Sequence, residues 1–184
     1  EFGELYKQVD GDIPDFWVDF DENIFDFKIG GACRYIGESA FEGVLNVQGQ
    51  LTIPGGVSGI GPSAFLGCQG FDGSLVLGGG LYSIGDNAFE NCFGLNGDLL
   101  IPPNVKNIGN SAFQNCQGFA GTLDLGKSLE TIGDSCFQSC SNLESKLKIP
   151  NTLKIISESA FYGCESIYGD LELPSGIEEV KENA

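Results

Sequence analysis

The segment GDLLIPPNVKNIGNSAFQNCQGFA, Gly97 to Ala120, is one unit of a repeat that fills most of this chain. Similar units follow one another every 24 residues without gaps, most visibly at Cys68, Cys92, Cys116, Cys140 and Cys164. A fixed period of this length is typical of stacked repeat proteins, in which a unit that cannot bury its own apolar face packs against its neighbours. The sequence therefore predicts a solenoid with one continuous core.

Each unit contains two kinds of apolar spacing. Leu99 and Ile101 alternate with an outward position, which is the pattern of a short strand with one buried face. Pro102 then ends the strand, and other units have proline or glycine there. From Ile108 to Cys116 the apolar spacing is that of a short helical or 3₁₀ turn. We therefore expect a parallel sheet of short strands on one face and short helical turns on the other.

The repeat divides the chain after residue 24. Residues 25–184 hold six full repeats and a seventh that stops at Ala184, where the pattern requires phenylalanine next, so we expect the array to continue. Residues 1–24 are predicted to be an acidic capping segment, because a solenoid end otherwise exposes its apolar core. A separate binding module is the alternative for this segment. Its candidate covering residues are Phe16, Trp17, Val18 and Phe20.

The chain is strongly acidic, with 9 Lys and Arg against 26 Asp and Glu and a formal net charge of −17. It lacks the basic surface that nucleic acids and anionic membranes require. No apolar run approaches the roughly 18 residues of a membrane span, so we expect no membrane insertion. The acidity is compatible with plain solubility, with a basic partner or with divalent cations.

The cysteine column could hold disulfides, zinc or free thiols. Neighbouring coils place equivalent atoms about 4.8 Å apart, but parallel side chains do not converge as a disulfide requires. A column also presents sulfur atoms in a line, whereas zinc needs a tetrahedron, and the chain has no histidine. We therefore predict small, buried, free thiols.

Two short motifs resemble ligand-binding loops. GTLDLGKS, Gly121 to Ser128, matches a phosphate-binding pattern, but Leu123 and Leu125 belong to the strand pattern of the repeat, so we interpret the match as a coincidence. The run from Asp19 to Asn23 begins like a calcium-binding loop and then departs from it. A solvated acidic cap is the favoured interpretation of this run, and an irregular calcium site is the alternative.

Nothing in the sequence marks a catalytic site. Without histidine, acid–base chemistry would depend on carboxylates, lysine or tyrosine, and no motif sets any of these apart from the repeat. Asp86, Asp134 and Glu158 recur at one repeat position, which favours a capping or solvent-facing role. We predict no enzyme, no catalytic residue, no cofactor and no metal ligand.

The repeat resembles the BspA-like leucine-rich repeat family. LTIPGGVSGIGPSAFLGCQGF and LLIPPNVKNIGNSAFQNCQGF follow its pattern L-x-I-P-x-x-V-x-x-I-G-x-x-A-F-x-x-C, and the resemblance covers roughly residues 25–184. The first unit departs at Gly30, Cys33 and Val44, and Ile156 and Ser157 stand where Ile-Gly is expected later on. The resemblance implies a right-handed, curved solenoid on secreted or cell-surface proteins of microbes, used for adhesion and protein binding.

The predicted sheet also defines a candidate partner-binding face. Residues between the inward leucines should point outward in a regular array, the surface on which repeat proteins bind partners. By register these are Lys28, Thr52, Val76, Leu100, Asp124, Lys148 and Glu172. A second outward row is Asp26, Gln50, Ser74, Asp98, Thr122, Lys146 and Asp170. Both rows could equally be surface filler, although Val76 and Leu100 would form a small apolar contact patch.

These observations favour a non-enzymatic protein-binding or adhesion module of a cell-surface or secreted protein. The expected partner is a protein ligand, either a host or matrix protein or another surface protein. A structural spacer or stalk in a larger repeat protein is the alternative. A calcium-dependent glycan-binding module is the third hypothesis.

Overall fold

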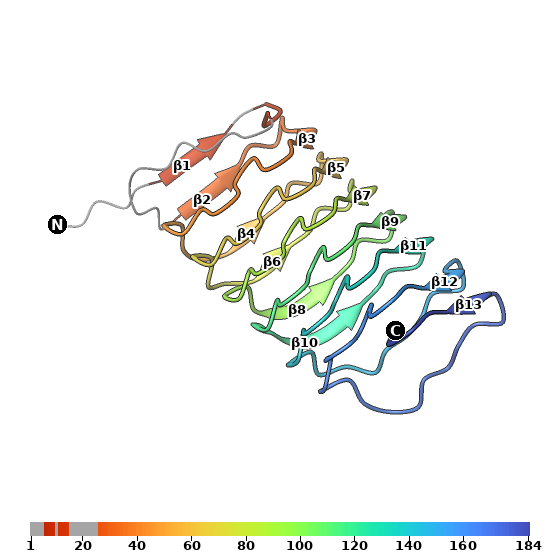
Figure 1. Ribbon diagram of the computed structural model, residues 1–184. Coiled ribbons are helices and arrows are strands. Elements are labelled where there is room, and N and C mark those ends of the chain that lie inside the picture. The colour runs from red at the N-terminus through yellow and green to blue at the C-terminus, as the bar shows by residue number, and fades with distance from the viewer. Residues whose placement is uncertain (1–5, 10, 15–25) are drawn as a thin grey trace.

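The computed structural model of the protein describes residues 6–9, 11–14 and 26–184. The chain winds into successive coils that stack along one axis, with β1 and β13 near opposite ends of the stack (Figure 1). Every pair of strands is parallel. The predicted solenoid is therefore confirmed.

Two ladders of strands run along the stack. The first ladder contains β1 (Tyr6–Val9), β2 (Asp26–Ile29), β4 (Leu51–Thr52), β6 (Leu75–Val76), β8 (Gly97–Leu100) and β10 (Phe119–Asp124). The second ladder contains β3 (Tyr35–Ile36), β5 (Gly59–Ile60), β7 (Ser83–Ile84), β9 (Asn107–Ile108), β11 (Thr131–Ile132), β12 (Ile155–Ile156) and β13 (Glu179–Val180). The first ladder is the predicted leucine sheet, in which Leu51 is opposite Leu75 and Leu99 is opposite Leu123.

The second ladder corrects the prediction of a helical turn over Ile108 to Cys116. Ile108 lies in β9, and strands β3, β5, β7, β9 and β11 form a five-stranded parallel sheet, so the isoleucine position builds a sheet of its own. Residues 110–115 form consecutive turns, and no residue from Gly109 to Cys116 is helical. We call this third side of each coil the turn side.

The backbone hydrogen bonds explain why the turn side is not helical. Ser111, Phe113 and Asn115 donate their N–H groups to the next coil at 2.8–2.9 Å. The alternate residues Gln114 and Cys116 donate within the coil, three residues back. Ser111 and Asn115 also have positive φ values of 52° and 61°, which an α-helix does not accept. Half of the donors that a helix would use internally are therefore committed to the neighbouring coil.

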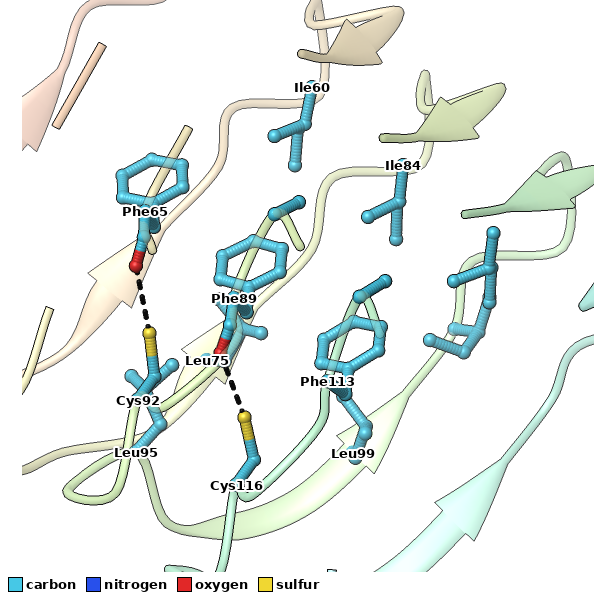
Figure 2. Close-up of a cluster of buried hydrophobic side chains, with 14 of the residues drawn as sticks. Ile60, Phe65, Leu75, Ile84, Phe89, Cys92, Leu95, Leu99, Phe113 and Cys116 are labelled. Carbon is cyan, nitrogen blue, oxygen red and sulfur yellow. Dashed lines mark hydrogen bonds between the residues drawn. The ribbon is translucent and has the colours of Figure 1, made fainter. Parts of the chain in front are cut away.

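The core lies between the two ladders and the turn side. Phe41, Phe65, Phe89, Phe113, Phe137 and Phe161 form a column in which successive rings stack 5.0–5.5 Å apart between centroids. Figure 2 shows three of these rings beside the leucines and isoleucines of the two ladders. Each phenylalanine thus packs on its own counterpart in the next coil, which is how a unit with little core of its own becomes buried.

The first ladder begins before the predicted start of the repeats at residue 25. Strand β1 pairs with β2, and Ile13 is buried and bridges to Ile36. The Asp12 carboxylate accepts hydrogen bonds from the backbone N–H groups of Arg34 and Tyr35 at 2.7 and 3.0 Å. The predicted covering residues Phe16, Trp17, Val18 and Phe20 lie outside the described residues, so the capping segment stays a prediction.

Glycine columns allow the coils to approach each other closely. A Cβ atom added at Gly61 would lie 2.7 Å from the Glu38 nitrogen, and one at Gly85 would lie 2.6 Å from the Pro62 nitrogen. The same column continues through Gly109 and Gly133. Backbone carbonyls of the preceding coil similarly leave no room for a Cβ at Gly118. These positions need glycine because any side chain would push neighbouring coils apart.

The coil that starts near residue 142 lacks these glycines. Asn142, Ser145 and Ser157 occupy the repeat positions of Gly118, Gly121 and Gly133. Residues 143–150 form no strand, and β12 pairs with β13 but not with β11. Both ladders are therefore interrupted between the coil of residues 118–133 and the coil of residues 142–157.

The turn side stays continuous across this interruption. Phe137 N–H still donates to Ala160 O at 2.8 Å, and the Phe137 and Phe161 rings remain stacked at 5.4 Å. The Asp134 carboxylate accepts the Glu158 N–H at 3.2 Å, whereas the equivalent bond from Asn110 N–H to Asp86 is 2.7 Å. The two coils thus keep their regular backbone bonds at the turn side and lose strand pairing at the ladders, where side-chain bonds such as Ser157 Oγ to Ile132 O and Thr152 Oγ1 to Leu129 O, both at 2.6 Å, join them instead.

Candidate interaction face

The structure places the predicted partner-binding row on the outside of the first ladder. Thr52 is half-buried, and the other members are exposed: Lys28, Val76, Leu100, Asp124, Lys148 and Glu172. Only the first five of the seven members lie in or beside regular strands, because residues 143–150 form none. The row is thus present as a surface, but the interruption divides it.

Val76 and Leu100 are the most distinctive members of this row. They are 42% and 51% exposed, while their neighbours Leu75 and Leu99 are buried. Strands β6 and β8 are in contact, and Ser74 bridges to Asn96 just before the two strands. Two branched apolar side chains therefore stand on adjacent strands at the surface.

The second predicted row carries a polar network at its N-terminal end. Ser74 Oγ donates to Gln50 Oε1 at 3.0 Å, and Gln50 Nε2 donates to Thr52 Oγ1 at 2.7 Å. Further along, the Asp98 carboxylate accepts the Thr122 N–H at 2.7 Å. These side chains are held in place by neighbouring coils, so this part of the face is ordered before any partner arrives. The side chain of Asp26, the first member of the row, lies outside the described set.

The second ladder has an outward face that sequence reasoning missed. Lys106 forms an ion pair with Glu130 at 2.7 Å and lies 5.7 Å above the centre of the Tyr82 ring. The pKa of Lys106 is raised, mainly by its hydrogen bond to Glu130. Lys154 pairs with Glu178 at 3.5 Å. The variable residues that precede each Ile-Gly pair carry this pattern in the sequence, but the prediction gave them no secondary structure because it began the helical turn at the isoleucine.

The cysteines are free thiols, as predicted, and all are buried except Cys164, which is half-buried. The structure adds a role for their sulfur atoms, since Cys92 Sγ donates to Phe65 O and Cys116 Sγ donates to Phe89 O, both at 3.0 Å (Figure 2). Each bond joins a coil to the one before it. Burial raises the pKa of Cys92 to about 12 and that of the half-buried Cys164 to about 11. These thiols are protonated at neutral pH and are poor nucleophiles and metal ligands.

The recurring carboxylates act as backbone caps. Asp86 Oδ1 accepts the Asn110 N–H at 2.7 Å, Asn110 Oδ1 accepts the Asp134 N–H at 2.8 Å, and Asp134 accepts from Glu158 in turn. The predicted capping role is therefore confirmed for Asp86 and Asp134, and Glu158 takes part through its backbone N–H. The carboxylate oxygen atoms that acid–base catalysis would use are thus already bonded to backbone N–H groups of the next coil.

Of the two segments that resemble ligand-binding loops, the structure describes only Gly121 to Ser128. In GTLDLGKS, Gly121 to Asp124 belong to β10, and Leu123 and Leu125 are buried, so this segment is a strand of the ladder rather than a loop around phosphate. Within the described ranges, no cluster of three or more His, Cys, Asp or Glu side chains could hold a metal ion. The run from Asp19 to Asn23 lies outside those ranges, so the calcium alternative is untested. The described part of the chain also has no helix long and apolar enough to cross a membrane.

A family model for the BspA-type leucine-rich repeat region matches residues 13–143 and 73–184, in 6 copies. The crystal structure of a leucine-rich repeat protein from Bacteroides ovatus ATCC 8483 is similar over 99% of this chain, with 25% identity and a TM-score of 0.72. This chain spans 43% of that protein. The Treponema pallidum leucine-rich repeat protein is similar over 73% of this chain and 69% of its own, with 22% identity and a TM-score of 0.55.

A leucine-rich cell surface protein from Faecalibacterium prausnitzii A2-165 is more distant, with 17% identity and a TM-score of 0.37 over 94% of this chain and 73% of its own. A likeness this weak supports no conclusion about the present chain. No curated protein matches the sequence.

Proposed function

Because the chain belongs to the BspA-type leucine-rich repeat family, we propose that it is a protein-binding module that mediates adhesion at a cell surface or after secretion. The proposed contact surface is the outer face of the first ladder. The proposed partner is a protein, either a host or matrix protein or another surface protein. We assign the module no reaction and no cofactor.

The observation that carries this proposal is the exposed pair Val76 and Leu100 on adjacent strands. Apolar side chains on a rigid sheet lose little conformational entropy when a partner covers them, so they suit a binding surface. The hydrogen-bonded side chains of Gln50 and Ser74 lie on the same ladder and supply ordered polar contacts near them. An apolar centre with a polar surround is the usual composition of a protein interface.

The alternative is a structural spacer in a longer repeat protein. The continuous phenylalanine column favours this role, because each ring packs on its counterpart in the next coil at 5.0–5.5 Å between centroids and the coils form one uninterrupted stack. A spacer needs no specific surface and should tolerate changes at Val76 and Leu100.

The test compares the purified chain with the double variant Val76→Lys/Leu100→Lys on a panel of immobilised matrix proteins, surface proteins and glycans, with calcium and with chelator. A matched control, Leu45→Lys/Tyr162→Lys, adds the same charge at exposed apolar residues outside both ladders. We expect saturable, calcium-independent protein binding that falls by about tenfold or more only in the first variant, because hot-spot residues carry most of the energy of an interface. Unchanged binding in the folded first variant, or no binding at all, would favour the spacer. Binding to glycans only with calcium would favour the third hypothesis.

A further inference from the structure

The interruption of the ladders opens a groove on the outer face. The groove has a volume of about 650 Å³ and lies between Leu123, Asp124 and Lys127 on one coil and Lys146 and Lys148 on the next. A second groove of about 450 Å³ shares Lys146 and Lys148 and extends toward Glu172. The only hydrogen bond between the described residues 123–125 and 145–149 is the long one from Ser145 Oγ to Leu123 O, at 3.4 Å. The groove thus lies at the coil in which Asn142, Ser145 and Ser157 replace the glycines found in the coils before it.

The groove concentrates positive charge in a strongly acidic protein. Three of the nine basic residues line it, namely Lys127, Lys146 and Lys148, and all three are exposed. By contrast, Lys106, Lys154 and Lys181 each form an ion pair with a carboxylate. Among the described residues, no carboxylate forms an ion pair with the three groove lysines, although Asp124, Asp170 and Glu172 lie along the same face. Asp124 instead accepts the Gly126 N–H at 2.9 Å.

The other residues that line the groove and the net charge of the protein limit the kind of ligand that can bind there. Ile101, Leu123 and Ile149 give the groove an apolar floor. The exposed Leu100 on β8 is opposite Asp124, which lines the groove. A polyanion such as nucleic acid or a heavily sulfated chain would be repelled by the net charge of −17 and would find only three lysines here. A ligand with a few carboxylates and apolar side chains between them matches both features.

We propose that this groove binds an extended peptide segment of a partner protein that carries two or three carboxylates beside apolar residues. The proposal rests on the protein-binding function proposed above and names the chemistry of the partner. Lysine ammonium groups supply up to three donors each for the carboxylates, and the apolar floor receives the side chains between them.

The test uses two fluorescently labelled hexapeptides, Asp-Leu-Asp-Leu-Glu-Leu and its uncharged counterpart Asn-Leu-Asn-Leu-Gln-Leu, titrated with the purified chain and followed by fluorescence anisotropy. The groove variant is Lys127→Gln/Lys146→Gln/Lys148→Gln. The control variant is Lys106→Gln/Lys154→Gln/Lys181→Gln, which removes the same charge from lysines that are already paired. Circular dichroism verifies that both variants are folded.

We expect saturable binding of the acidic peptide, about tenfold weaker for the groove variant and within about twofold of the parent for the control variant, because only the groove lysines contact the carboxylates. The uncharged peptide should bind at least about tenfold more weakly than the acidic one. Three outcomes would overturn the proposal: no saturable binding of the acidic peptide, equal losses in both variants, or binding of a singly sulfated disaccharide in place of the peptide. In each of these cases, binding that still depends on Val76 and Leu100 would leave the proposed function standing without this groove.

Discussion

At the scale of single residues, the repeat selects groups that satisfy a neighbouring coil as well as their own. The cysteine is the clearest case, because its small thiol fills a buried site and also donates to the carbonyl of a phenylalanine 27 residues earlier. Alanine would fill the space less well and donate nothing, and the valine at this position in the first unit, Val44, is buried but has no side-chain donor. The carboxylate or amide at positions 86, 110 and 134 does the same for a backbone N–H of the next coil.

The buried thiols predict a loss of stability at alkaline pH. Their ordinary pKa is 9.0, and burial raises that of Cys92 to about 12, so the folded state holds its proton where the unfolded state loses it. This contribution is fully present below pH 9 and declines as the pH rises through about 12, by about 1.4 kcal/mol per pH unit for each such thiol. Urea unfolding in reducing buffer between pH 7 and 10.5 measures the decline. The variant Cys92→Ala/Cys116→Ala should have a lower free energy of unfolding at pH 7 and a shallower decline, whereas an unchanged slope would contradict this explanation.

At the scale of secondary structure, the glycine columns decide whether two coils can pair. Gly85 approaches the backbone of the preceding coil so closely that a Cβ would overlap it, while Gly79 has nothing within 4 Å. Both positions hold glycine, and they differ in how closely the backbone of the neighbouring coil approaches. Where Ser145 and Ser157 replace such glycines, the strands beside them are unpaired across the junction, and Ser157 Oγ donates to Ile132 O at 2.6 Å instead.

Alanine substitutions at these two glycines should therefore differ sharply. We expect Gly85→Ala to destabilise the fold by about 2 kcal/mol or more, since overlap of a Cβ with backbone forces neighbouring coils apart. Gly79→Ala should change stability by no more than about 1 kcal/mol, with the loss of chain entropy in the unfolded state acting in its favour. Chemical denaturation measures both variants. Similar effects at the two positions would mean that close packing between coils does not limit stability.

At the scale of the whole molecule, the stack has two parts joined mainly along the turn side. Up to residue 133 the second ladder and the turn side are continuous, and the first ladder pairs as β4 with β6 and β8 with β10. The following coil has no strand pairing to this part and is held by turn-side backbone bonds such as Phe137 N–H to Ala160 O at 2.8 Å and by side-chain bonds such as Ser157 Oγ to Ile132 O at 2.6 Å. In repeat proteins, stability is the sum of the units and of the interfaces between neighbours, so a weak interface separates two cooperative units. The same interruption creates the lysine-lined groove.

Hydrogen exchange should reveal this division. We expect the amides of residues 142–184 to exchange through an opening of lower free energy than those of residues 51–133, because side-chain hydrogen bonds replace strand pairing in both ladders at the junction. Native-state exchange at increasing urea, read by mass spectrometry of peptides, measures both free energies. The variant Asn142→Gly/Ser145→Gly/Ser157→Gly should bring the two values closer together. Uniform protection along the parent chain would contradict a weak junction.

Much of the fold could be predicted from the sequence because the same local pattern recurs in every repeat. The period of 24 residues, the leucine strands, the buried free thiols and the outward direction of Val76 and Leu100 were all predicted from the columns. Alternation between buried and exposed positions is a local property of a strand, so it can be read from one unit alone. A column of parallel cysteines in a chain without histidine similarly argues against disulfides and zinc sites.

Only the tertiary structure decided how each coil meets the next. The segment from Ile108 to Cys116 has helical spacing in one unit, but its backbone donors bond to a neighbouring coil, so it becomes a second ladder and a series of turns. The groove at Lys146 and Lys148 likewise depends on distances between coils. Three substitutions for glycine, at positions 142, 145 and 157, were visible in the sequence, but their joint effect on one junction depends on which backbone atoms lie opposite them. Local patterns carry no information on that contact, because it forms between residues about 24 positions apart.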